Sequence, residues 1–267
     1  MLNSRERRYA FAFLLLTLNA LTTFGGVAVL EHGWLAAALN LFDVSAIVWL
    51  ALVAGIALLW QADSVALVGR SDTVILAGAV LAALLPVPVA SSAMLTLVAG
   101  WGVWSSERGS TLRRASTIIL SLTAFLLWGR IGLAWGAGPL LSADARFVGL
   151  IADTRTAGNA VFFADGTRFV IAPGCSSLHG ISLALILWTT VVEYFSIRTD
   201  PRAWLTLALA LVASVLVNGV RLAVIAWNPN DFEYWHTGTG GALFGWIALG
   251  VILAVVYPGV GHARRST

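Results

Sequence analysis

Long apolar runs separated by short polar segments dominate the chain from near its first residue to near its last. An α-helix needs about 20 mostly apolar residues to cross the hydrocarbon core of a membrane. The pattern therefore predicts an all-α integral membrane protein, a single polytopic domain over residues 1–267 with about eight transmembrane helices. We place these spans at residues 9–30, 38–60, 72–90, 91–106, 115–137, 176–197, 203–226 and 240–259.

The third and fourth predicted spans adjoin each other, and the fourth is short. Pro86, Pro88, Ser91 and Ser92 lie where one ends and the other begins, and residues of these types favour a tight turn. We therefore expect a helical hairpin in this part of the chain.

Composition and charge support a membrane location. Hydrophobic residues make up 59% of the chain, charged residues only 11%, and the mean hydropathy is +0.87; a soluble domain carries about 25% charged residues. The net charge is +3, and all 16 cationic residues are Arg. They form short clusters between apolar runs, which membrane topology explains better than a basic surface for nucleic acid. We expect contact with a lipid bilayer and none with nucleic acid.

The positions of the Arg residues predict the orientation. With eight spans, 11 of them fall on one face and four on the other, while Arg130 lies inside the fifth span. Because cytoplasmic loops carry the excess of basic residues, both termini are predicted to be cytoplasmic, in the cytoplasmic membrane of the cell. A seven-span arrangement would divide the Arg clusters between the two faces.

The longest polar segment, residues 138–174, is then predicted to lie outside. Within it, residues 159–164 and 167–172 are apolar, aromatic and β-branched runs separated by Asp165 and Gly166. An Asp-Gly pair suits a two-residue type I′ turn. We therefore expect a small extracytoplasmic β-hairpin before the sixth span.

Cys175 follows this segment and is the single cysteine of the chain, which excludes an internal disulfide. A lone cysteine is most often a small buried hydrophobe. However, Pro173 and Gly174 mark a turn just before it, so Cys175 is predicted to lie near a helix N-terminus. The free N–H groups and the dipole at such a position stabilise a thiolate. Cys175 is therefore a candidate nucleophile at the outer membrane surface.

Arg221 and His236 are predicted to reach the same surface. A charge inside a span costs about 2.5–3.5 kcal/mol, so Arg221 either extends to the surface or stabilises a developing oxyanion; Asn218 shares its helix face. His236 is either simply solvated or a general base for a thiol. His179, four residues after Cys175 on the same helix face, is an alternative base.

These motifs resemble those of the exosortase/archaeosortase family: Cys175 followed by Ser176, then Asn218 and Arg221 as Asn-x-x-Arg, then His236. The resemblance covers residues 170–250. It implies an integral membrane cysteine protease-transpeptidase that acts on membrane-anchored proteins bearing a C-terminal sorting signal. It also implies the roles: Cys175 is the nucleophile, His236 the general acid/base and Arg221 the stabiliser of the tetrahedral intermediate.

The resemblance implies that no metal and no organic cofactor is needed, and that the active site lies at the outer face of the cytoplasmic membrane. Ser177 departs from the pattern, because the family often has Gly at that position; the departure bears on the subfamily and the substrate motif. Two other interpretations remain open. A non-catalytic transporter or assembly factor would use Arg130 and Asp43 to mark a pathway, and an acyltransferase would use Cys175 as an acyl carrier.

Overall fold

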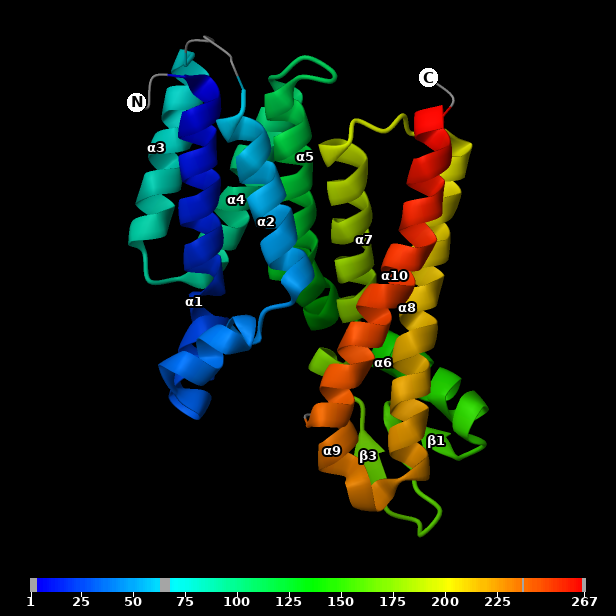
Figure 1. Ribbon diagram of the computed structural model, residues 1–267. Coiled ribbons are helices and arrows are strands. Elements are labelled where there is room, and N and C mark those ends of the chain that lie inside the picture. Colours follow the sequence, from blue (N-terminus) through cyan, green and yellow to red (C-terminus); the bar gives the residue numbers. More distant parts are fainter. Residues whose placement is uncertain (1–3, 63–67, 237, 266–267) are drawn as a thin grey trace. The chain divides into compact units, whose positions relative to one another are not determined.

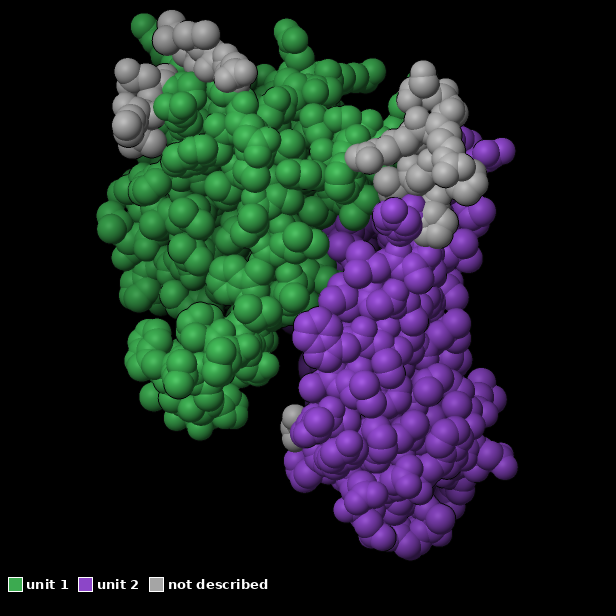
Figure 2. All heavy atoms as spheres, viewed as in Figure 1, with its two compact units in different colours: residues 1–128, 189–198 green, residues 129–188, 199–267 purple. Residues whose placement is uncertain are grey.

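The computed structural model describes residues 4–62, 68–236 and 238–265 (Figure 1). The chain forms two compact units (Figure 2). Unit 1 comprises Met1–Trp128 and Thr189–Arg198, and unit 2 comprises Gly129–Trp188 and Thr199–Thr267.

Unit 1 is built from helices. In it α1 packs against α2, α3 and α4, and α5 packs against α2 and α4. The elements are α1 (Arg5–Leu39), η1 (Leu41–Asp43), α2 (Ala46–Trp60), α3 (Arg70–Leu84), α4 (Pro88–Trp104), α5 (Thr111–Thr123) and the π-helical turn η2 (Ala124–Trp128).

Unit 2 combines helices with a small sheet. In it α8 packs against both α6 and α10, and the sheet lies near one end of these helices, beside α9 (Figure 1). The elements are α6 (Gly129–Ala152), β1 (Thr156–Ala157), β2 (Ala160–Phe162), β3 (Arg168–Val170), η3 (Pro173–Cys175), α7 (Ser177–Tyr194), α8 (Pro201–Trp227), η4 (Pro229–Asp231), α9 (Phe232–His236) and α10 (Thr239–Arg265). The last turns of α7, residues 189–194, belong to unit 1.

The structure confirms a largely helical chain with helices able to span a membrane, but it does not confirm all eight predicted spans. Each of the eight predicted ranges contains a helix, but among the described residues five helical stretches are long and apolar enough to cross a membrane. These are Arg5–Leu39, Thr111–Ala152, Ser177–Tyr194, Pro201–Trp227 and Thr239–Tyr257.

The helical hairpin of the third and fourth predicted spans is present, but its turn is shorter than the sequence indicated. Ser91 and Ser92 lie inside α4, not in the turn, and both are buried. Ser91 accepts a hydrogen bond from the Asn19 amide, which satisfies the hydroxyl within the apolar interior of unit 1. At 15 residues, α3 is about 22 Å long, well short of the roughly 30 Å hydrocarbon core.

The prediction that residues 138–174 form one polar segment was wrong for its first part. The helix α6 continues through a bend at Gly136 and past Pro139 to Ala152. Its buried residues recur at helical spacing, which the charged residues between them obscured in the sequence. They are Leu141, Asp144, Ala145, Val148 and Ala152.

The predicted hairpin is present, with a third strand added. β2 pairs antiparallel with β1 and with β3, and Val161 lies opposite Phe169. The two-residue type I′ turn was wrong. The Gly166 N–H donates to the Phe163 carbonyl and, of residues 164–166, only Gly166 has positive φ. These features match a three-residue loop that ends in a left-handed glycine.

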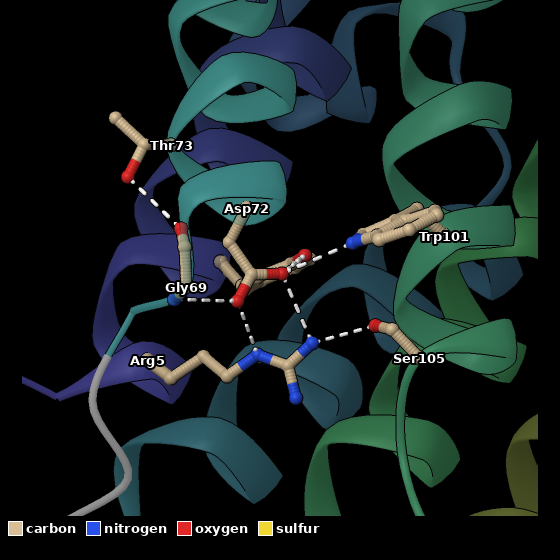
Figure 3. Close-up of polar contacts among 7 residues, drawn as sticks. Arg5, Gly69, Asp72, Thr73, Trp101 and Ser105 are labelled. Atoms are coloured by element: carbon tan, nitrogen blue, oxygen red, sulfur yellow. Dashed lines mark hydrogen bonds and ion pairs between the residues drawn. The ribbon is translucent and has the colours of Figure 1, made fainter.

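A buried carboxylate fixes one end of unit 1 (Figure 3). The Asp72 side chain on α3 accepts hydrogen bonds from Arg5 and Tyr9 on α1 and from the indole N–H of Trp101 on α4, at 2.7–3.0 Å. The backbone N–H of Gly69 adds a further donor at 3.2 Å. These hydrogen bonds satisfy the carboxylate. Because the side-chain donors lie on α1 and α4 and the acceptor lies on α3, the cluster joins three helices.

We expect Asp72→Asn to destabilise the protein strongly. Removing one partner of a buried ion pair typically costs about 3–5 kcal/mol, because the remaining charge stays buried without compensation. Thermal unfolding in detergent should show a Tm well below wild type, whereas the same change at the exposed Asp165 should leave the Tm unaltered. Equal Tm values for the two variants would contradict a structural role for Asp72.

Candidate active site

Cys175 lies in a short irregular segment held from both sides. It is the last residue of η3, and α7 begins two residues later. Its N–H donates to the Ala172 carbonyl, and its own carbonyl accepts a hydrogen bond of 3.0 Å from the side-chain amide of Asn218 on α8. The half-buried thiol packs at the edge of an apolar cluster. The backbone around the sulfur is therefore anchored to a helix from another part of unit 2.

The imidazole of His236 lies next to the thiol. His236 is the last residue of α9, and its Nε2 is 2.8 Å from Sγ of Cys175, across 61 residues of chain. The ring of Phe232, one turn earlier in α9, stacks on the imidazole with 4.9 Å between ring centroids. The stacking limits rotation of the imidazole, so Nε2 stays directed at the sulfur.

Arg221 connects α8 to the histidine. Its Nε donates to the Trp235 carbonyl at 3.4 Å, and Nη2 donates to the His236 carbonyl. Both acceptors are at the C-terminal end of α9, where carbonyls lack partners within the helix. A guanidinium donates hydrogen bonds to such carbonyls, and its positive charge interacts favourably with the negative end of the helix dipole. Arg221 therefore fixes the backbone that carries His236.

The segments that carry Cys175 and His236 pack against an apolar cluster in unit 2. It joins α6, the sheet and α8, and Cys175, Phe232 and Trp235 pack against it. A Cβ added to Gly219 would come within 2.2 Å of the Phe147 ring, so only glycine permits α6 and α8 to approach this closely. The cluster consists of Leu141, Ala145, Val148, Ala152, Val161, Phe169, Ile171, Leu222, Ala223, Ile225 and Ala226.

The sequence interpretation missed one polar residue at this site, Asp144 on α6. Its carboxylate accepts hydrogen bonds from the N–H of Ser177 at 3.0 Å and from the Ser177 hydroxyl at 2.6 Å. Both residues are buried. The sequence predicts an outer polar segment that begins at residue 138, where a buried aspartate is not expected. The helical spacing of Asp144 from Leu141 and Val148 is the signal that identifies it.

His179, Ser176 and Asp43 do not make the contact with Cys175 that His236 makes. His179 is in the first turn of α7, where its backbone N–H donates to the Ser176 carbonyl and its side chain is exposed. Ser176 is buried, and its hydroxyl has no hydrogen-bond partner among the described residues. In unit 1, Asp43 lies in η1 and is 3.9 Å from His32.

Burial and charge favour an uncharged thiol–imidazole pair. Burial raises the pKa of the Cys175 thiol above its ordinary value, and the nearby positive charge of Arg221 opposes this only in part. Burial and then Arg221 lower the pKa of His236, with Glu233 acting in the opposite direction. The thiolate expected from the sequence is therefore disfavoured at rest, since loss of hydration outweighs the charge of Arg221 and the backbone hydrogen bond at Ala172.

Among the described residues, no group of three or more His, Cys, Asp and Glu side chains is arranged to hold a metal ion.

Comparisons of the chain with models of protein families, with curated proteins and with solved structures find no match.

Alkylation of Cys175 as a function of pH tests the uncharged pair. Because thiolate is the reactive form and Cys175 is the single cysteine, the iodoacetamide rate should rise with pH through a midpoint above that of the denatured chain. Mass spectrometry of the intact protein measures the rate. A plateau of high reactivity reaching below pH 6 would instead indicate a resting thiolate–imidazolium ion pair.

Proposed function

We propose that the chain is a membrane-embedded cysteine protease-transpeptidase of the exosortase/archaeosortase type. It cleaves the C-terminal sorting signals of exported proteins at the outer face of the cytoplasmic membrane. The observation that carries the proposal is the 2.8 Å contact between Sγ of Cys175 and Nε2 of His236. A thiol in reach of an oriented imidazole is the arrangement that activates a cysteine nucleophile.

The membrane setting of the proposal rests on the helices and on the Arg distribution. In the part of the chain that the structure describes, five apolar helical stretches are long enough to cross a bilayer, and the proposed arrangement of eight spans adds the shorter helices of unit 1. The Arg clusters favour cytoplasmic termini, which puts Cys175 on the opposite face. A substrate anchored by its own helix would present its scissile bond at a fixed depth, and such orientation lowers the barrier to attack.

The acylation step uses two neighbouring atoms, Sγ of Cys175 and Nε2 of His236. Nε2 of His236 accepts the thiol proton as Sγ of Cys175 bonds to the scissile carbonyl carbon. The tetrahedral intermediate then collapses, the C–N bond breaks, and the same Nε2 returns the proton to the leaving amine. The products of this step are a thioester on Cys175 and a released C-terminal segment.

The second step resolves the thioester. Water or an acceptor amine attacks the thioester carbon, and Nε2 of His236 takes a proton from that nucleophile. The C–S bond breaks, and the sulfur regains a proton from the imidazolium. The chain thus ends in its starting state, with an acid or an amide as the second product.

In this proposal Arg221 acts electrostatically. Its positive charge is close enough to lower the pKa of both Cys175 and His236, so it stabilises negative charge that develops at the reacting centre. A guanidinium has five N–H donors, and hydrogen bonds from two of its nitrogens hold the carbonyls of α9. The same side chain therefore orients the base and favours the oxyanion.

The sheet contributes to the shape of the proposed site. β3 leads into η3 and Cys175, and Phe169 on β3 packs against Phe232 of α9, with 6.1 Å between ring centroids. This contact links the hairpin to the helix that carries His236. Deleting residues 159–172 should therefore impair processing, whereas normal processing by that variant would remove the hairpin from the site.

Substitution of the four candidates in cells tests the proposal. Cys175→Ala and His236→Ala should each abolish processing, and Arg221→Ala should lower it at least 100-fold, the scale for loss of one oxyanion donor. His179→Ala is the matched control, a second histidine near Cys175 that should retain activity. The measurement is the mass shift of a membrane-anchored substrate on a blot, at equal enzyme levels.

Other outcomes of this experiment favour the alternative functions. Processing that survives Cys175→Ala would remove the nucleophile and leave the transporter or assembly factor, for which solute flux independent of Cys175 is the direct measurement. Labelling of Cys175 by lipid but not by peptide would favour the acyltransferase.

The pH dependence of kcat/KM provides a separate prediction. The reactive form carries one proton shared by Cys175 and His236, so activity should rise with pH as the imidazolium is lost and fall as the thiol is lost. The pKa of His236 is lowered and that of Cys175 is raised. We therefore expect a broad bell whose acid limb lies below about pH 6.5 and whose alkaline limb lies above about 8.5. A narrow bell centred near pH 7 would contradict it.

A further inference from the structure

We propose that Asp144 is a positioning residue for the Cys175 nucleophile and acts through Ser177. The catalytic consequence rests on the proposed function, while the positioning of the sulfur can be tested without it. The observation is the pair of hydrogen bonds, at 3.0 and 2.6 Å, from the Ser177 N–H and hydroxyl to the two oxygens of the Asp144 carboxylate.

The burial of this pair makes it strong and rigid. Asp144 is 7% exposed and Ser177 is 4% exposed, so water does not compete for the carboxylate. Hydrogen bonds to an ionised acceptor are about twice as strong as neutral ones. The pair also offsets the cost of burying a carboxylate within an apolar cluster. Ser177 is therefore fixed to α6.

Two anchors then bracket the nucleophile. Asn218 on α8 holds the carbonyl of Cys175, and Asp144 on α6 holds the N–H of Ser177. Only Ser176 lies between the two anchored residues, and it is 1% exposed. The backbone of this segment has little freedom, so the sulfur position relative to His236 depends on both anchors.

A small movement at this point has a large effect. A displacement of about 1 Å in a reacting group typically lowers a rate about 100-fold. Losing the Asp144 anchor would free Ser177 to move and would lengthen the 2.8 Å contact between Cys175 and His236. Asp144 itself does not need to touch the substrate.

Ser177 makes it possible to weaken the link to Asp144 in two steps. Ser177 stands where the resembling family often has Gly, and its hydroxyl supplies the shorter of the two hydrogen bonds. Ser177→Gly removes that bond and leaves the backbone N–H as a donor to Asp144. Its effect should therefore be smaller than that of Asp144→Asn, which weakens the acceptor for both.

Asp200 offers a matched control within unit 2. It caps α8 by accepting a hydrogen bond of 2.8 Å from the Ala203 N–H. Like Asp144, it is an aspartate bound to the first turn of a long helix. It lies at the opposite end of α8 from Arg221 and is exposed. Asp200→Asn therefore reports the general effect of altering a helix cap.

The experiment measures two quantities on the full-length protein in detergent or membranes. For processing, Asp144→Asn should lower kcat about 100-fold with little change in KM, Ser177→Gly should lower it less than about 10-fold, and Asp200→Asn should match wild type. The double variant Asp144→Asn/Ser177→Gly should be no slower than Asp144→Asn alone, because both changes break the same link.

Iodoacetamide alkylation of Cys175 is the second readout. Asp144→Asn should move the midpoint toward that of the denatured chain, since a displaced sulfur is less buried, and Asp200→Asn should not. If Cys175→Ala still processes substrate, the proposed function fails, and alkylation alone decides the positioning role. Wild-type alkylation and processing by folded Asp144→Asn would overturn the inference. If Asp144→Asn does not accumulate, Ser177→Gly takes its place: a kcat and an alkylation midpoint both equal to wild type would then overturn the inference.

Discussion

The contact between the Cys175 thiol and the His236 imidazole is the interaction on which the proposed function of this chain depends. It joins residues 61 positions apart and is maintained by groups that bind backbone: Asn218 at Cys175, and Arg221 at the end of α9. All of these residues belong to unit 2. Packing of α6 against α8 at Gly219 brings the supports together, so the geometry of the pair depends on close helix packing.

Burial gives this pair its electrostatic character. Loss of hydration raises the pKa of the thiol and lowers that of the imidazole, and both changes favour the uncharged forms. An uncharged pair avoids the cost of an ion pair in an apolar setting. On the proposed function, the thiolate forms only when a substrate carbonyl carbon is in place to accept its electrons. A half-buried cysteine of low resting reactivity is therefore compatible with the proposed catalysis.

The sequence predicted which residues meet and missed how they are held. Helix polarity alone brings the start of α7, the end of α8 and the start of α10 to one end of unit 2, and that sufficed for Cys175, Arg221 and His236. Asp144 was missed because its charge, with that of Arg146, broke the apolar pattern of a helix that continues to Ala152. The partners of Arg221 depend on side-chain orientation, which periodicity does not contain.

Asp72 and Arg221 are two charged groups held by fixed partners. Asp72 accepts hydrogen bonds from three side chains and a backbone N–H, and Arg221 donates to two carbonyls. Such partners satisfy the need for hydrogen bonds away from water. Cys175 and His236 share a proton that either can hold. A fixed framework around one movable proton is the arrangement that acid–base chemistry requires, and this distinguishes the candidate site from the structural cluster at Asp72.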